Sequence, residues 1–131
     1  MDRLASAGLL VSRVLLAAIF LVSGAEKLFA FGPTMGAMAA QGMHMPGMFL
    51  VLAILVEIGG GLSVLAGYYP RPGALALALY LVPVTLVFHR GLADPNQAAH
   101  FAKNVAIIGG LLAIVSAGGG EFSVGARKRW T

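Results

Sequence analysis

Glu57 is the residue with the clearest chemical potential, because it is the single charge in the apolar run Met48–Gly67. About 20 apolar residues, at ~1.5 Å rise per residue, are needed to cross the hydrocarbon core of a bilayer. A carboxylate near the middle of such a run costs roughly 2.5–3.5 kcal/mol to insert, so it normally faces a partner or a cavity. Glu57 is therefore a candidate proton acceptor or proton relay.

Other polar side chains fall on the small or polar faces of the neighbouring predicted helices, at 100° per residue. We expect the following of them to form a pocket with Glu57: Arg13, Lys27, His89, Lys103 and Asn104. All but Arg13 lie near the external ends of their predicted helices. The sequence thus predicts a polar funnel that opens outward, with Glu57 as its floor. The donors of His89, Lys103 and Asn104 would suit a small anion, a carbonyl compound or a quinone oxygen.

These polar residues also have structural explanations. An ion pair between Arg13 and Glu57 could simply hold two helices in register. Lys27, Arg90 and Glu26 could extend their charged ends to the membrane interface. Glu26 is expected to point away from the polar face of its helix, which suits a subunit contact or exposure to solvent.

A loop after the first apolar run is rich in methionine. Thioether and imidazole ligands suit Cu(I), which makes Met43, His44 and Met45 weak candidates for a metal site. Methionine is also a flexible apolar filler for a surface helix, and we prefer this explanation and predict no metal there. The sequence contains no cysteine, which excludes cysteine-ligated metals or clusters and thiol redox chemistry within the chain.

Four apolar spans must position these side chains, at about residues 8–29, 48–67, 72–88 and 101–117. The chain is 59% hydrophobic and 11% charged, whereas an average soluble domain has about 25% charged residues. Because backbone groups cannot stay unpaired in lipid, we predict an all-α integral membrane four-helix bundle formed by one domain, residues 1–131. Between the first two spans, Pro33 suits the first turn of a short external interfacial helix that ends at about Gln41. Tyr68–Arg71, with Pro70 and Pro72, is expected to be a tight turn that makes the second and third spans antiparallel neighbours. The segment Arg90–His100, which contains Asp94, is expected to be a polar loop.

The distribution of charge predicts the orientation of the bundle. With four crossings both termini lie on one side, and that side carries most of the cations: Arg3, Arg13, Arg71, Arg127, Lys128 and Arg129. The positive-inside rule then places the N- and C-termini in the cytoplasm. The first span also resembles a signal peptide, but we expect it to be retained as the first helix. Attraction to anionic lipid explains the high isoelectric point, so no nucleic-acid partner is predicted.

Several short motifs in this order resemble the DoxX family of small four-helix membrane proteins. The matching stretches are Arg13 with Ser23-Gly24-Ala25-Glu26-Lys27-Leu28, Glu57-Ile58-Gly59-Gly60-Gly61-Leu62, Phe88-His89, Phe101-Ala102-Lys103-Asn104-Val105-Ala106 and Gly109-Gly110-Leu111-Leu112. The resemblance implies a bacterial inner-membrane protein. It also implies a link to oxidoreduction, because relatives of the DoxD type are connected with thiosulfate:quinone oxidoreduction and some members belong to membrane oxidoreductase assemblies.

Three functions remain open from the sequence. The first is a subunit of, or accessory to, a quinone-linked membrane oxidoreductase, with Glu57 as proton relay and His89, Lys103 and Asn104 at the quinone head. The second is a non-catalytic module that binds or transports a small solute or lipid. The third is an accessory bundle that stabilises a larger membrane complex. The expected partners are the lipid bilayer and either other membrane subunits or further copies of the chain.

Overall fold

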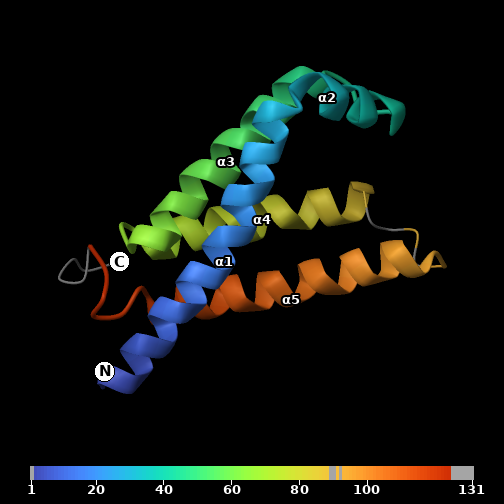
Figure 1. Ribbon diagram of the computed structural model, residues 1–131. Coiled ribbons are helices and arrows are strands. Elements are labelled where there is room, and N and C mark those ends of the chain that lie inside the picture. The colour runs from blue at the N-terminus through green and yellow to red at the C-terminus, as the bar shows by residue number, and fades with distance from the viewer. Residues whose placement is uncertain (1, 89–90, 92, 125–131) are drawn as a thin grey trace.

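The computed structural model describes residues 2–88, 91 and 93–124 of the chain, and the regular elements within this part are all helices. The helices are α1 (Arg3–Phe29), α2 (Phe31–Ala40), α3 (Pro46–Ala66), α4 (Pro70–Phe88) and α5 (Pro95–Ala117). Within the described residues, 4 of these helices are long and apolar enough to cross a membrane, all except α2 (Figure 1). The predicted all-α membrane bundle is confirmed, and a short helix does lie between its first two spans.

The last long helix begins earlier than the sequence reading placed it. We expected this span to start near Phe101, whereas α5 starts at Pro95. The Asp94 carboxylate accepts a hydrogen bond from the backbone N–H of Asn96 at 3.0 Å, and proline suits the first position of a helix. Lys103 therefore lies about two turns, or roughly 12 Å, inside the helix rather than near its start.

The connection between α3 and α4 is a tight turn, as predicted, so these two helices are antiparallel neighbours. Gly67 adopts a φ of 71°, and its N–H donates to the carbonyl of Ser63 at 3.0 Å. Because the turn is so short, residues at equal distances before and after it face each other. Gly60 lies against Leu77 in this way, and a Cβ placed on Gly60 would sit 2.8 Å from the Leu77 Cγ.

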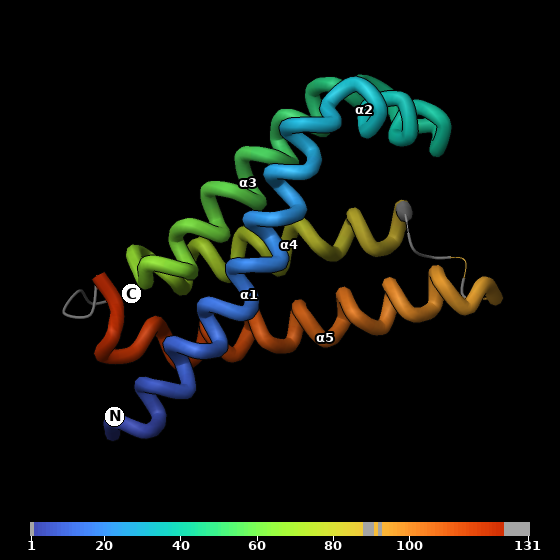
Figure 2. Tube along the Cα trace, in the orientation of Figure 1, coloured from blue at the N-terminus to red at the C-terminus, as the bar shows by residue number. Residues whose placement is uncertain are grey.

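Helices α1 and α3 also approach closely, as Figure 2 shows along the length of their crossing. A Cβ on Gly24 would lie 2.6 Å from Ile58 Cγ1, and a Cβ on Gly61 would lie 3.0 Å from the side chain of Leu21. Small residues let helix backbones come together in a membrane, where no hydrophobic effect drives helices toward each other. The glycines near Glu57 therefore bring α1 within reach of its carboxylate.

Helices α1 and α5 meet at only one end of the bundle. Gly110 lies next to Leu16, and the N–H of Glu121, in the segment after α5, donates to Ser6 Oγ at 3.3 Å. Toward the other end, the two helices diverge (Figure 2). The packed core, which includes Phe20 and Leu111, therefore leaves room between α1 and α5 on the side that holds the start of α5.

Candidate functional site

Glu57 lies in the middle of α3, is only 4% exposed, and forms the centre of a hydrogen-bond cluster. Its Oε1 accepts from three donors: Ser23 Oγ at 3.2 Å, Lys27 Nζ at 3.1 Å and Tyr80 OH at 3.0 Å. Lys27 Nζ also donates to Ser23 Oγ at 2.7 Å. The contact with Lys27 is an ion pair, so the buried carboxylate has a cationic partner.

The helix geometry explains why these donors converge. Ser23 and Lys27 are four residues apart on α1 and therefore lie on one face. Gly24 lies between them and permits the close approach to α3. Tyr80 and Glu57 lie at the same distance from the α3–α4 turn to within one residue, so the antiparallel pairing places the two side chains opposite each other.

The second carboxylate oxygen, Oε2 of Glu57, differs from the first. It is buried, and no hydrogen-bond partner for it exists within the part of the chain that the structure describes. A buried polar atom is normally paired, because an unpaired one costs about 1–3 kcal/mol or more. Glu57 therefore keeps one acceptor atom that no described residue uses.

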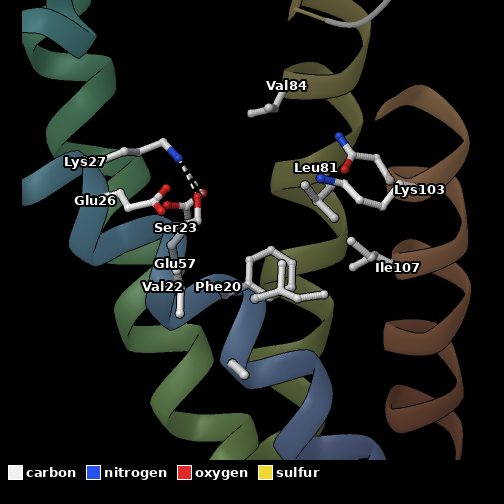
Figure 3. Close-up of a pocket in the computed structure, with 13 residues that line it drawn as sticks. Phe20, Val22, Ser23, Glu26, Lys27, Glu57, Leu81, Val84, Lys103 and Ile107 are labelled. Atoms are coloured by element: carbon white, nitrogen blue, oxygen red, sulfur yellow. Dashed lines mark hydrogen bonds and ion pairs between the residues drawn. The ribbon is translucent and has the colours of Figure 1, made fainter. Parts of the chain in front are cut away.

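Glu57 lines a pocket of about 540 Å³ between α1, α4 and α5 (Figure 3). The polar side chains that line it are Ser23, Glu26, Lys27, Glu57, Lys103 and Asn104. The remaining lining residues are apolar, and they include Phe20, Leu81 and Ile107. Figure 3 shows Lys103 on α5 across the pocket from Lys27 and Glu57, so polar groups lie at opposite sides of an otherwise apolar space.

Asn104 is held in place at the wall of this pocket. Its Nδ2 donates to Thr85 Oγ1 at 3.0 Å, and both residues are buried. The bond connects α4 with α5 in an apolar layer, where an unpaired amide would be costly. Lys103, one position earlier, is exposed.

Arg13 does not lie beside Glu57, which corrects the pairing expected from the sequence. Arg13 is fully buried, and its Nη1 donates to the carbonyls of Val64 at 3.3 Å and Leu65 at 3.2 Å. Its Nη2 donates to the carbonyl of Phe122. The Arg13 guanidinium thus binds carbonyls at the end of α3 that lack an intrahelical partner. Arg13 is not among the described residues that line the pocket.

Other expectations have mixed outcomes. Glu26 lines the pocket rather than pointing away from it. Lys27 makes the ion pair with Glu57 instead of only reaching the interface. His89 lies outside the described residues. Tyr80 was missed, although the predicted α3–α4 turn would have placed it opposite Glu57.

The methionine-rich segment remains without a metal assignment. Met43 is half-buried, whereas His44 and Met45 are exposed. Among the residues that the structure describes, no group of 3 or more His, Cys, Asp or Glu side chains could hold a metal ion. Met43, His44 and Met45 are not among the residues that line the pocket with Glu57.

Comparisons with known proteins agree with the motifs in the sequence. The family model described as DoxX matches residues 8–90. The chain is 35% identical over 132 residues to the inner membrane protein YqjF of Escherichia coli (strain K12), a match that covers 99% of this chain and 100% of the relative. It is 28% identical over 124 residues to the inner membrane protein YphA of the same organism, covering 91% of this chain and 89% of that relative. No solved structure matches the chain.

Proposed function

Since the chain belongs to the DoxX family, we propose that it is a small inner-membrane protein that binds a quinone, or a similar amphiphile, as a subunit of a quinone-linked oxidoreductase system. The observation that carries this proposal is the pocket of about 540 Å³ with Lys27 and Glu57 on one side and Lys103 with Asn104 on the other. Both relatives are inner membrane proteins, which supports the proposed location.

The composition of the pocket wall fits a quinone. Such a molecule has an apolar ring and tail and two oxygen acceptors at opposite positions of the ring. Phe20, Leu81 and Ile107 offer apolar surface for the ring, while cationic donors lie at both sides of the space. A largely apolar pocket with a few placed polar groups is the usual form of a small-molecule site.

Access to the pocket favours a ligand that is dissolved in the membrane. Ile19 and Val22 on α1 are among the lining residues, and they are 45% and 57% exposed. Both lie on a membrane-spanning helix, so their exposed surfaces face lipid. An amphiphile dissolved in the membrane can therefore enter from the lipid between α1 and α5. A small water-soluble solute would reach the pocket from water instead, so it would not use this opening.

Each polar residue has a role in this proposal. Lys103 and Asn104 bind one oxygen of the ligand, and Lys27 fixes the Glu57 carboxylate. Glu57 receives a proton from the other oxygen. When bound, a quinone supplies the capacity to take up or release two electrons together with two protons.

A binding measurement tests the proposal. The purified protein in lipid nanodiscs is titrated with a short-chain benzoquinone in a calorimeter. Lys103→Met should weaken binding about tenfold or more, because a hydrogen bond from a charged donor contributes about 1.5–3 kcal/mol. Arg3→Met is the matched control, since Arg3 is an exposed cation at the opposite end of the bundle and does not line the pocket.

Two outcomes would contradict the proposal: no binding by the native protein, or equal affinity in the native protein and Lys103→Met. Purification in a mild detergent tests the second half of the proposal separately. A redox-active membrane subunit that co-purifies in a fixed ratio is expected. Quinone binding without such a partner would instead favour a non-catalytic binding module.

A further inference from the structure

The two oxygens of the Glu57 carboxylate have unequal surroundings. Oε1 accepts hydrogen bonds from Ser23, Lys27 and Tyr80, whereas Oε2 is buried and has no donor among the described residues. Because the side chain is 4% exposed, bulk water offers little compensation. The donors nearest to the carboxylate among the described residues already bond to Oε1, so Oε2 is free to accept from a molecule in the pocket that Glu57 lines.

The ion pair determines what kind of molecule this can be. Lys27 Nζ lies 3.1 Å from Oε1, so the carboxylate has an ammonium group as its partner at that oxygen. An ionised carboxylate only accepts hydrogen bonds. The oxygens of a quinone also only accept, and placing one of them at Oε2 would bring two acceptors together. A hydroxyl group, by contrast, donates to Oε2.

The side of the pocket opposite Glu57 does not distinguish a quinone oxygen from a quinol hydroxyl. Lys103 and Asn104 offer N–H donors, and both a carbonyl oxygen and a hydroxyl oxygen can accept from them. This side of the pocket therefore sets no preference between an oxidised and a reduced ligand.

From this asymmetry we propose that the pocket selects the hydroxyl-bearing quinol form of its ligand over the quinone, with Glu57 Oε2 as the acceptor of the ligand hydroxyl. The inference rests on the proposed function and adds to it which redox form the site holds. A hydroxyl bonded to a charged acceptor should favour the quinol about tenfold. For a two-electron couple, this preference corresponds to a rise of roughly 30 mV in the midpoint potential of the bound couple.

The experiment compares three ligands that share one ring skeleton. Native protein in nanodiscs is titrated without oxygen with 2,3-dimethoxy-5-methyl-1,4-benzoquinone, with its quinol, and with the dimethyl ether of that quinol. The ether keeps the ring and both oxygens but lacks the hydroxyl protons. The quinol should bind about tenfold more tightly than either of the other two. Because this comparison uses native protein, it does not depend on the folding of any variant.

A pair of variants locates the preference. Glu57→Gln replaces the charged acceptor by an amide that can also donate, so the quinol preference should fall to about twofold or less. Glu121→Gln is the matched control, because Glu121 carries an exposed carboxylate that does not line the pocket. It should keep the tenfold preference.

The outcomes separate this inference from the function on which it rests. Equal binding of quinone and quinol, or tighter binding of the quinone, overturns the inference and leaves the quinone-binding function intact. Binding of the ether as tight as that of the quinol overturns it as well, and so does an undiminished preference in a folded Glu57→Gln protein. Failure of all three ligands to bind overturns both the inference and the proposed function.

Discussion

Arg13 caps the C-terminal end of α3, where the last carbonyl groups of the helix would otherwise be unpaired. It donates to the carbonyls of Val64 and Leu65, while the flanking carbonyls of Ser63 and Ala66 accept backbone N–H groups from the following segments. A carbonyl group without a hydrogen-bond donor lowers the stability of the folded protein where little water is present. A cation at this position also complements the negative end of the helix dipole. Arg13 is thus a structural residue, and the cation that serves the pocket carboxylate is Lys27.

This role predicts a loss of stability when the guanidinium is removed. Arg13→Met keeps much of the side-chain length but leaves the carbonyls of Val64 and Leu65 without a donor. We expect the free energy of unfolding to fall by about 2–4 kcal/mol, because each bond from a charged donor contributes about 1.5–3 kcal/mol and some of this is offset by relaxation. Unfolding in mixed micelles, followed by circular dichroism, measures the change.

Two comparisons accompany the Arg13 experiment. Arg13→Lys keeps the charge but loses the fork of donors, so its stability should lie between those of the native protein and Arg13→Met. Arg3→Met removes an exposed arginine from the same helix and should change stability by less than about 0.5 kcal/mol. A native level of stability in Arg13→Met would refute the capping role.

At the scale of the helices, the α3–α4 turn controls which residues meet. The turn and its antiparallel pairing were predicted from the prolines around it, and this is sufficient to place Tyr80 opposite Glu57. The depth of Lys103 was misjudged because the cap formed by Asp94 was interpreted as part of a loop. The partners of Arg13 could not be predicted, since one of them belongs to an irregular segment with no periodicity to place it.

Adjacent glycines on α3 test this helix register. A Cβ on Gly60 would lie 2.8 Å from Leu77 Cγ, whereas a Cβ on Gly59 would meet nothing within 4 Å. Gly60→Ala should therefore cost about 1–3 kcal/mol of stability, as overpacking of a closed interface does. Gly59→Ala is the matched control and should be neutral or raise stability by up to about 1 kcal/mol. Denaturant titration in mixed micelles gives both values.

A double substitution makes the register test specific to one contact. In a Leu77→Ala background the space opposite residue 60 is open, so Gly60→Ala should lose most of its cost. The non-additivity of the two substitutions then reports direct contact between the two positions. Equal costs of Gly60→Ala with and without Leu77 would mean that the helices are paired in another register.

For the whole molecule, the start of α1 and the segment after α5 lie at one end of the bundle. The opening between α1 and α5 lies toward the other end. Ser6 near the start of the chain bonds to the backbone of Glu121, beyond the last helix. Figure 1 shows the start of α1 and the segment that follows α5 on the same side, away from α2 and from the start of α5. An even number of crossings requires this arrangement. The direction of the bundle in the membrane then decides which compartment lies nearer the Glu57 pocket.

We predict cytoplasmic termini, because the charges of the connecting segments favour that orientation. Lys27 and Lys103 line the pocket, so neither acts as a loop charge. Of the remaining cations, Arg3, Arg71 and the sequence Arg127-Lys128-Arg129 belong to the end with the termini, while Arg90 belongs to the other. Cations near helix ends are retained on the cytoplasmic side. The pocket would therefore open toward the outer half of the membrane.

Reporter fusions measure this orientation directly. A green fluorescent protein fused after Thr131 should fluoresce, because it folds in the cytoplasm, and alkaline phosphatase at the same site should be inactive. Alkaline phosphatase inserted after Ala93, between α4 and α5, should be active, since this enzyme needs the oxidising external compartment. The reverse pattern of activities would show that the bundle has the opposite orientation, with both termini outside the cytoplasm. Because the pocket lies nearer the α5 start than the termini, that result would place the exchange of protons with Glu57 on the cytoplasmic side.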